Sequence, residues 1–295
     1  MNWRLKALTL WTLHAAPYGN DLHFILQKRI TKSLPRKPSL YPQYLAAAER
    51  RRDQLLTAGP LEGKTMLEFG AGWDLFCNIV FYCYGLDRQI LVDLNSHMRP
   101  ELVDDVIAEL QKAPPTGAKR SPPKLLGERP METLKEVYGI EYRAPADARK
   151  LDMVDGAVDL VATTNTLEHI PFGSLEQIMR ECHRVCHRDG LVCMQIDYSD
   201  HFSHADQSIT PYNFLQFSET GWRSYNPPNQ YQNRRRHSDY RRMFREAGYM
   251  ILDEEVERPE DWEPMLARVN INSEFSNYSR DDISITGGLF VLRPI

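Results

Sequence analysis

The sequence has little cysteine, no long apolar run and no excess of positive charge, and each of these absences excludes a class of protein. The five cysteines among 295 residues are too sparse for a disulfide framework, which favours reduced thiols in a cytoplasmic protein. No apolar run approaches the roughly 18 residues that a membrane-spanning helix needs. The formal net charge of -4 argues against nucleic acid as a partner.

The N-terminal segment 1–37 is the one strongly basic part of the chain. It holds seven basic residues against a single acid, and Trp3 and Trp11 stand among aliphatic neighbours. A cleavage site with small residues is missing, so an amphipathic helix fits better than a signal peptide. Such a helix either packs on the domain, forms a dimer contact or lies on an anionic membrane surface. We therefore expect a cytoplasmic monomer or homodimer, with peripheral membrane contact as an open alternative.

Strand-like runs alternate with helix-like stretches along most of the chain. The expected strands are 64–72 with its glycine turn, 89–95, 140–147, 157–165, 191–198, 250–257 and 283–294. The expected helices are 41–58, 73–85, 99–113, 131–139, 174–190 and 237–249, the last with Ser238 as its N-cap. Repeated strand–helix units with apolar strands indicate an α/β fold, in which helices cover both faces of a mostly parallel sheet.

Two stretches interrupt this alternation. Residues 113–130 carry five prolines and two glycines, which is typical of a surface loop and of local disorder. Residues 199–236 are aromatic and polar without a clear period. We therefore expect a basic helical extension over 1–60, one α/β domain over 61–295, and within that domain an insert over 199–236.

A tight glycine turn follows the first expected strand, in the run LEFGAG. A strand that leads into a glycine turn and then a helix presents backbone N–H groups to a ligand. A dinucleotide-binding turn needs a third glycine, and Leu75 stands at that position. Trp73 would crowd a pyrophosphate and Glu68 would repel one. The turn therefore favours a cationic nucleoside ligand over a nicotinamide dinucleotide.

Two further carboxylates stand at the ends of expected strands. Asp93 lies 21 positions after Gly72, where an acid can accept hydrogen bonds from both hydroxyls of a ribose. Asp147 ends the third strand, where it can accept from an adenine amino group. Ligands bind at the carboxyl ends of the strands in open α/β sheets, so these acids and the glycine turn predict one nucleoside site.

Four runs of the sequence resemble, in order and spacing, the motifs of class I S-adenosylmethionine-dependent methyltransferases: LEFGAG, LVDLN, PADARKLDMVDGAVDLVATTNTLEHI and ECHRVCHRDGLVCM. The resemblance implies a Rossmann-like sheet of seven strands with an antiparallel last strand, S-adenosylmethionine as cofactor and S-adenosylhomocysteine as product. The residues that it implies at the cofactor are Glu68, Gly70, Ala71 and Gly72 on the methionine side, Asp93 and Leu94 at the ribose, Asp147 and Ala148 at the adenine, and Asn165, Thr166 and Leu167 beside the sulfonium.

The insert 199–236 has the composition of an acceptor pocket, and in the resembled family the segment after the fifth strand commonly covers the acceptor. The candidate substrate-binding residues are Tyr212, Asn213, Trp222, Asn233 and Arg234. Aromatic rings with neighbouring amides fit a saccharide, and the arginine run 234–236 fits a phosphate or carboxylate. The alternative is that the aromatic residues are core and the arginines form a solvated face.

The run DYSDHFSH, residues 197–204, begins at the end of the fifth strand. Methyl transfer to a hydroxyl needs a group that takes the proton, and a histidine titrates in the right range. The catalytic candidates are His201 in the first place, then His204 and His169. Asp200 is the candidate for orienting the base.

The run NTLEHI raises the question of a metal. In one branch of the resembled family an E-x-x-E-H motif and a later histidine hold a divalent ion, and the corresponding ligands here would be Glu168, His169, His201 and His204. Asn165 stands in place of the first glutamate, and the loss of that carboxylate weakens the binding of a hard cation. We therefore expect no metal.

The resemblance and the content of the insert together favour methyl transfer from S-adenosylmethionine to a hydroxyl of a glycan or lipid-linked small molecule, with O-methylation favoured over N-methylation. A nicotinamide-dependent Rossmann oxidoreductase is one alternative, against which Leu75 counts. A methyltransferase-like scaffold without turnover is the other, against which the intact set of motifs counts.

Overall fold

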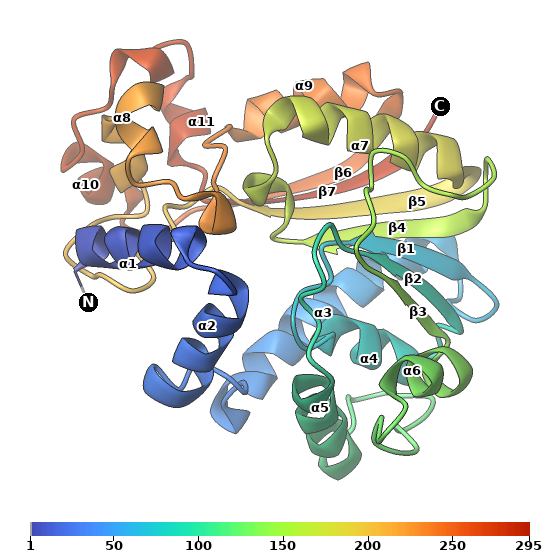
Figure 1. Ribbon diagram of the computed structural model, residues 1–295. Coiled ribbons are helices and arrows are strands. Elements are labelled where there is room, and N and C mark those ends of the chain that lie inside the picture. Colours follow the sequence, from blue (N-terminus) through green and yellow to red (C-terminus); the bar gives the residue numbers. More distant parts are fainter. Residues whose placement is uncertain (1) are drawn as a thin grey trace.

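Seven strands form one mixed sheet in the order β3-β2-β1-β4-β5-β7-β6 (Figure 1). The structure is a computed structural model that describes residues 2–295, so Met1 of the basic segment lies outside the described residues. The strands are β1 (Thr65–Phe69), β2 (Arg88–Val92), β3 (Ile140–Arg143), β4 (Val158–Thr164), β5 (Cys186–Asp197), β6 (Tyr249–Glu257) and β7 (Gly287–Pro294). Strand β7 runs antiparallel to β5 and β6, whereas the other neighbours pair in parallel. The predicted seven-stranded sheet with a reversed last strand is confirmed.

Helices cover both faces of this sheet (Figure 1). The helices of the described chain are α1 (Trp3–Ala15), α2 (Gly19–Ile25), α3 (Tyr41–Leu55), α4 (Phe76–Cys83), α5 (Pro100–Lys112), α6 (Pro130–Tyr138), α7 (Phe172–Val185), α8 (Glu219–Arg223), α9 (His237–Glu246), α10 (Trp262–Ala267) and α11 (Arg280–Ser284). Helices α3, α4 and α5 lie on one face, and α7 and α9 lie on the other. Side chains alternate between the two faces, so Met66 joins the apolar cluster under α3 and α4, whereas Leu67 joins the cluster under α7 and α9.

The last helix of the expected extension 1–60 belongs to the layers of the sheet. Helix α3 buries Ala48 and Leu55 completely, in the apolar cluster that also contains Met66 of β1. Gly59, with φ of +96°, ends this helical stretch, in agreement with the sequence prediction. The part of the extension that stands outside the layered core is therefore the segment before α3.

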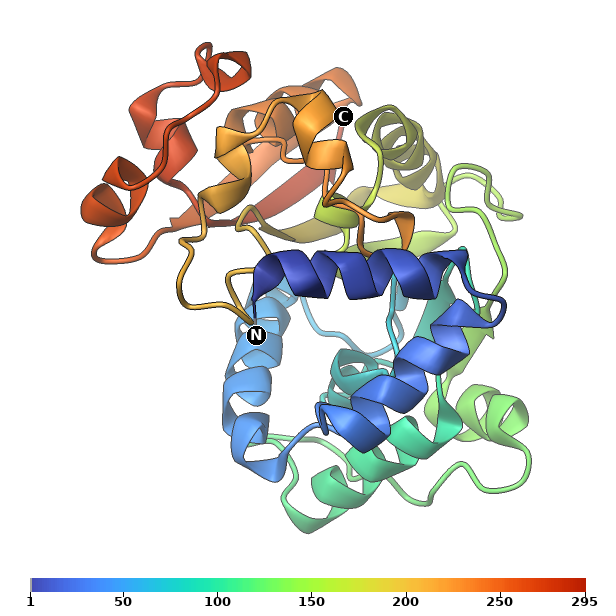
Figure 2. The same ribbon diagram turned by 60° about the vertical axis from the view of Figure 1, so that its left-hand side comes forward.

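Helix α1 packs against the insert and crosses in front of the sheet (Figure 2). Trp3 is 5% exposed and shares a third apolar cluster with Trp222. The N–H of Trp3 donates to Asp206 at 2.8 Å, and Nε1 of Trp11 donates to the carbonyl of Ser224 at 3.0 Å. Packing of this helix on the domain is thus confirmed, and Trp3 is too deeply buried to anchor a membrane.

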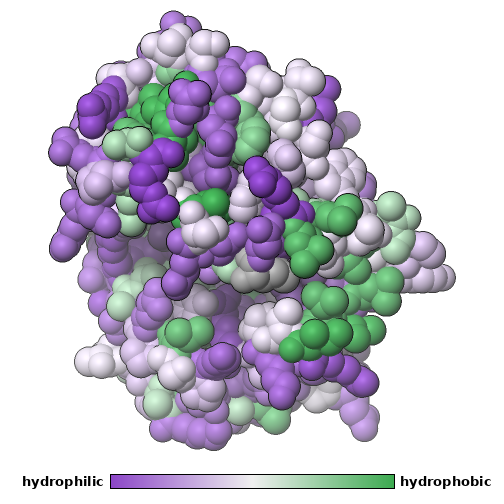
Figure 3. All heavy atoms as spheres, turned by 90° about the vertical axis from the view of Figure 1, so that its left-hand side faces the viewer, coloured by the Kyte–Doolittle hydropathy of each residue, from purple (hydrophilic) through white to green (hydrophobic). Residues whose placement is uncertain are grey.

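Other apolar side chains of the N-terminal segment remain exposed. Leu5 and Leu8 on α1, Leu22 and Ile25 on α2, and Ile30 beyond it are more than two fifths exposed. Figure 3 faces this side of the molecule and shows apolar side chains among strongly hydrophilic ones. In residues 2–295, no helix is long and apolar enough to cross a membrane.

The proline-rich stretch 113–130 is held against the domain, and its predicted disorder is wrong. Nη2 of Arg120 donates to the carbonyl of Leu86 at 2.7 Å, and the N–H of Leu126 donates to Asp104 at 2.7 Å. Leu126 is also buried. The composition predicted the loop correctly. It could not indicate that the loop is ordered, because the contacts that hold it are made with residues distant in the sequence.

Two helix boundaries also differ from the sequence prediction. The helix expected over 174–190 ends at Val185, because Cys186 already pairs with Val158 at the start of β5. The N-cap of α9 is Arg236, and the hydroxyl of Ser238 donates to Asp282 instead of capping the helix.

Candidate active site

The carboxyl ends of β1, β2 and β3 are joined by backbone hydrogen bonds at one edge of the sheet. The N–H of Gly70 donates to the last carbonyl of β2 at 3.0 Å, and the N–H of Asp93 donates to Arg143 at 3.1 Å. The N–H of Ala146 donates to the carbonyl of Asp93 at 2.9 Å. These bonds bring the glycine turn, Asp93 and the segment that leads into Asp147 side by side.

The glycine turn lies so close to the loop after β4 that Gly70 has no room for a side chain. Gly70 and Gly72 have φ of +75° and +79°, which residues with a Cβ rarely adopt. A Cβ on Gly70 would lie 2.3 Å from Cγ2 of Thr166. The hydroxyl of Thr166 donates to the carbonyl of Gly70 at 3.3 Å. Two of the predicted cofactor residues are therefore in direct contact.

Asp93 braces the glycine turn. Its Oδ1 accepts from the N–H of Ala71 at 3.0 Å, and its Oδ2 accepts from the hydroxyl of Tyr142 at 2.9 Å. Burial raises the pKa of Asp93 to about 6, although these hydrogen bonds act in the opposite direction. A carboxylate has about four acceptor positions, so Asp93 keeps capacity for further donors such as ribose hydroxyls. Leu94 beside it is 67% exposed.

The remaining predicted cofactor residues lie in the loops after β3 and β4. Asp147 and Ala148 are half-buried. The guanidinium of Arg149 contacts Asp147 at 2.7 Å and lowers the pKa of that carboxyl. Asn165 is exposed and has the left-handed φ of +50°. All three are accessible at the same edge of the sheet as the glycine turn.

Glu68 and Leu167, also predicted at the cofactor, are buried beneath the loops. The side chain of Glu68 faces α4 and accepts from Nδ2 of Asn78 at 2.8 Å. Burial raises the pKa of Glu68 to about 7. Leu167 belongs to the apolar cluster under α7 and α9. Because side chains alternate between the faces of β1 and pack tightly after β4, the side chains of both residues support the loops from beneath. Neither side chain is open to a ligand.

Helix α2 covers the residue that follows the glycine turn, a contact that the sequence did not indicate. The ring of Phe24 stacks on Trp73, with centroids 5.5 Å apart and an interplanar angle of 11°. Arg99, after β2, forms an ion pair with Asp21 of α2. The N-terminal segment therefore touches the glycine turn through α2 and the insert through α1.

Three histidines gather around two carboxylates at the ends of β4 and β5. Nε2 of His201 lies 3.3 Å from Oδ2 of Asp197 and 4.0 Å from Oε1 of Glu168. Nε2 of His169 lies 4.0 Å from the same oxygen of Glu168. Nε2 of His204 lies 3.8 Å from Oδ2 of Asp197. The structure thus brings the three predicted catalytic candidates together.

Burial controls the charges in this cluster. Both side-chain oxygens of Glu168, which is 3% exposed, lack a hydrogen-bond partner, and burial raises its pKa well above the usual value. Burial also lowers the pKa of His169 to about 4, and its Nδ1 lies 2.7 Å from the carbonyl of Tyr231. Burial opposes the ionisation of Asp197, but the contact with His201 holds the pKa of that carboxyl below its usual value. An ionised Asp197 therefore faces His201.

A sequence-family model described as a methyltransferase domain matches residues 42–254, well over half of the chain. The match spans the glycine turn, Asp93 and the histidine cluster. This chain belongs to that methyltransferase family. S-adenosylmethionine is therefore the methyl donor of the domain, and the nicotinamide alternative is set aside.

Solved structures with the fold of this methyltransferase share little of its sequence. Geranyl diphosphate C-methyltransferase from Streptomyces coelicolor A3(2), in complex with Mg2+, geranyl diphosphate and S-adenosyl-L-homocysteine, is 14% identical with a TM-score of 0.50, over 89% of this chain and 86% of that one. The PH0226 protein from Pyrococcus horikoshii OT3 is 14% identical with a TM-score of 0.46, over 84% of this chain and 91% of that one. A comparison with curated proteins found no match. At this identity the likeness concerns the fold alone.

In the methyltransferase, the orienting role predicted for Asp200 does not fit its position. Asp200 is fully buried, and its oxygens accept from Nδ2 of Asn213 and from the N–H of Phe202, each at 2.8 Å. Asp197 lies next to His201 instead, because the chain turns directly after β5. Sequence reasoning missed Asp197, although its spacing of four residues from His201 was a usable signal.

The five predicted acceptor-binding residues lie inside the insert. They are Tyr212, Asn213, Trp222, Asn233 and Arg234, and each is buried or half-buried. The hydroxyl of Tyr212 donates to the carbonyl of Ser284 at 2.7 Å, and Nη1 of Arg234 donates to Phe217 at 2.7 Å. Asn233 and Arg234 also line a cavity of about 410 Å³ on the side of α7. The alternative, in which the aromatic residues are core, fits this packing better than an open acceptor site. Its other half, a solvated face of arginines over 234–236, is wrong, because Arg234 and Arg236 are buried.

Part of the histidine cluster has the geometry of a metal site. One ligand atom from each of Glu168, His169 and His201 lies within 4.8 Å of the others. Asp197 contacts Nε2 of His201 at 3.3 Å but is not one of the residues that converge on this point, so the site offers a single carboxylate. Imidazole nitrogens with carboxylate oxygens suit a divalent first-row metal.

Proposed function

We propose that this methyltransferase transfers a methyl group to a hydroxyl of a glycan or of a lipid-linked small molecule. The 3.3 Å contact between His201 and Asp197 at the end of β5 carries the proposal. A hydroxyl must lose its proton during the transfer, whereas an amine need only arrive neutral. A histidine beside an ionised carboxylate supplies that function.

The proposed cofactor site lies at the ends of β1 to β4. Its residues are Gly70, Ala71 and Gly72 at the methionine part, Asp93 and Leu94 at the ribose, Asp147 and Ala148 at the adenine, and Asn165 and Thr166 beside the sulfonium. The backbone bonds among the ends of the first three strands support this arrangement, since they hold the glycine turn against Asp93. The accessibility of Leu94 and Asn165 supports it as well.

In the proposed reaction the acceptor oxygen attacks the methyl carbon in line with the sulfur. The C–O bond forms while the C–S bond breaks, and the electron pair of that bond returns to sulfur to give S-adenosylhomocysteine. The hydroxyl proton passes to Nδ1 of His201, because Nε2 of that ring faces Asp197. The Asp197 carboxylate then stabilises the imidazolium. His204, which also lies near Asp197 and is more exposed, can pass the proton to solvent.

A divalent ion is a second candidate for activating the hydroxyl, and the unpartnered oxygens of Glu168 favour it. Glu168, His169 and His201 would hold the ion, which would lower the pKa of a bound hydroxyl. Elemental analysis of the purified protein and turnover after EDTA separate the two candidates. A stoichiometric metal whose removal stops turnover supports the ion, and full turnover without metal supports the imidazole.

The lipid-linked class of acceptor is supported by the N-terminal surface. The exposed Leu5 and Leu8 share α1 with Arg4, and Lys28 and Arg29 follow α2. Exposed aliphatic and basic side chains on one surface favour peripheral contact with an anionic membrane. Flotation with vesicles that contain anionic phospholipid tests this contact. L5E together with L8E should abolish it, and equal binding to neutral vesicles would contradict the role of charge.

Methyl transfer from labelled S-adenosylmethionine to saccharides, lipid-linked saccharides and matched amines tests the proposed function. H201Q is expected to lower kcat by about 10²- to 10⁴-fold, the range of general-base catalysis. H187Q is the matched control, since His187 is an exposed histidine near the other end of β5. Transfer to amines alone would contradict the hydroxyl class, and full turnover in H201Q would contradict the role of His201.

A further inference from the structure

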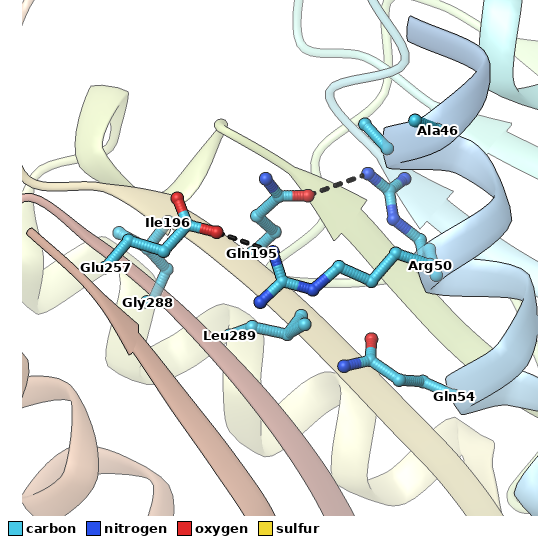
Figure 4. Close-up of a pocket in the computed structure, with 10 residues that line it drawn as sticks. Ala46, Arg50, Gln54, Gln195, Ile196, Glu257, Gly288 and Leu289 are labelled. Atoms are coloured by element: carbon cyan, nitrogen blue, oxygen red, sulfur yellow. Dashed lines mark hydrogen bonds and ion pairs between the residues drawn. The ribbon is translucent and has the colours of Figure 1, made fainter. Parts of the chain in front are cut away.

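A cavity of about 330 Å³ opens between α3 and the ends of β5 and β7 (Figure 4). Its polar lining comes from Arg50, Arg51 and Gln54 of α3, Gln195 of β5 and Glu257 of β6. None of the described residues that line it is among the predicted cofactor residues. Its volume lies at the lower end of the range for small-ligand sites.

Arg51 is the unusual member of this lining. It is 1% exposed, and its Nε and Nη1 have no hydrogen-bond partner. Nη2 donates to Oε1 of Gln195 at 3.3 Å, a long bond to a neutral group. A buried charge without an anionic partner is destabilising, so such a group favours a ligand of opposite charge.

The acids around Arg51 do not neutralise it. Glu257 lies across the cavity but contacts Nη1 of Arg50 at 2.6 Å (Figure 4). Glu255 also pairs with Arg50. Glu68 feels the charge of Arg51, which opposes the effect of burial on its pKa, but its side chain hydrogen-bonds to Asn78 and not to Arg51. Burial raises the pKa of Glu68 to about 7, which limits the negative charge that it offers near neutral pH.

The cavity lies close to the histidine cluster, because both include residues at the end of β5. Gln195 and Asp197 are two residues apart on β5, so their side chains leave the strand on the same face. Their separation along the strand is roughly 7 Å, from the rise of about 3.3 Å per residue. A sugar ring spans such a distance.

We propose that this cavity binds a carboxylate or phosphate group of the methyl acceptor through Arg51. The proposal rests on the proposed function and names the acceptor as an anionic saccharide, of the uronic acid or sugar phosphate kind. Arg51 donates charge-assisted hydrogen bonds from its free nitrogens to the anion, and the hydroxyl to be methylated lies toward Asp197 and His201. In this arrangement Arg51 is a specificity residue and has no part in the proton transfer.

Calorimetry on the protein saturated with S-adenosylhomocysteine tests the proposal, with glucuronate, glucose 6-phosphate and glucose as probes. We expect the wild type to bind one of the anionic sugars at least tenfold more tightly than glucose, and R51M to lose this preference. R52M is the matched control, because Arg52 on the same helix pairs with Asp53 and does not line the cavity. Absence of the preference in the wild type, or its persistence in R51M, would overturn the proposal.

The anionic group that Arg51 binds could also come from a second molecule, because the cofactor carries an amino-acid carboxylate. Binding of S-adenosylhomocysteine and of 5′-methylthioadenosine, which lacks the amino-acid part, distinguishes the two sources. We expect R51M to change neither affinity by more than twofold. A loss of tenfold or more for S-adenosylhomocysteine alone would assign the cavity to the cofactor and overturn the acceptor assignment.

Thermal unfolding separates a binding role of Arg51 from a structural one. Removal of an unpaired buried charge should leave the Tm of R51M unchanged or raise it, and glucuronate or glucose 6-phosphate should raise the Tm of the wild type alone. A large fall in the Tm of R51M without ligand would show that Arg51 supports the fold and would overturn the proposal. These binding and unfolding measurements need no turnover. They can contradict the role of Arg51 while methyl transfer to a hydroxyl is still observed, and they can support it when no such transfer is observed.

Discussion

The ends of β1 to β3, the proposed donor edge of the sheet, and the ends of β4 and β5, the proposed acceptor edge, are built by different means. The donor edge relies on backbone hydrogen bonds, on glycines and on Asp93, whose carboxylate is bonded within the edge itself. The acceptor edge relies on side chains from distant segments, and two of them, Glu168 and Arg51, are buried without adequate partners. The donor edge thus satisfies its carboxylate within the fold, whereas the acceptor edge leaves two buried charged groups that, as proposed above, a ligand would meet.

The largest expected effect comes from breaking the donor edge at Gly70. G70A should lower the free energy of unfolding by about 3–4 kcal/mol, because its Cβ would meet Thr166 in a left-handed backbone. G63A is the matched control: Gly63 has a similar φ of +73° and nothing within 4 Å of an added Cβ, so its cost should be about 1 kcal/mol. Urea unfolding measures both. Equal costs would show that the contact with Thr166 does not require glycine.

Substitution of Asp93 tests the donor edge through the affinity of the protein for S-adenosylhomocysteine. D93A should weaken the binding of S-adenosylhomocysteine by about 100-fold, because the loop donors and the ribose lose one charged acceptor. Y142F removes a single hydrogen bond to Asp93 and should weaken binding by about tenfold or less. H201Q, at the acceptor edge, should leave this affinity unchanged. Calorimetry that finds full affinity in D93A would remove Asp93 from the cofactor site.

The ionisation of Glu68 makes the stability of the protein depend on pH. Its pKa is raised in the folded protein to about 7 from an ordinary value of 4.5, so its contribution to stability is present below pH 4.5 and is lost as the pH rises through 7. E68Q removes this titration and keeps an acceptor for Asn78. Relative to E68Q, the wild type should lose about 2 kcal/mol of stability between pH 5 and pH 8. Parallel curves for the two proteins in urea unfolding would contradict the raised pKa.

The smallest expected effect tests whether the insert contacts the acceptor through its aromatic core. Y212F removes the buried hydrogen bond to Ser284 and should cost about 1 kcal/mol of stability. Because Tyr212 is fully buried, KM for the acceptor should stay within twofold of the wild type. A large rise in KM without loss of stability would indicate that Tyr212 contacts the acceptor.

The sequence predicted the strand ends of the donor edge well because the signals for them are local. Apolar runs that end in glycine or aspartate define strand ends, and parallel strands bring those ends to one edge whatever the details of packing. The side chains of Glu68 and Leu167 are buried, which the sequence did not indicate, because their burial depends on the face that each takes beneath the loops.

The acceptor edge was predicted less well, since its partners lie far apart in the chain. The gathering of His169, His201 and His204 was expected, but Asp197 and not Asp200 stands beside His201. The aromatic residues of the insert were expected at the acceptor, and they form a core with α1 instead. Arg51 gave no signal, because a single arginine in a basic helix has no period or spacing that marks it as unpaired.

The shared core of α1 and the insert constrains how this enzyme can evolve. Trp3 packs on Phe202 and Tyr225, at ring-centroid distances of 5.8 and 4.8 Å, so a change on either side must be matched by one on the other. At the donor edge the N-terminal segment contacts Trp73 through Phe24, but backbone hydrogen bonds and Asp93 hold the glycine turn without it. The N-terminal segment and the insert are therefore expected to change in sequence as a pair, since one buried core joins them.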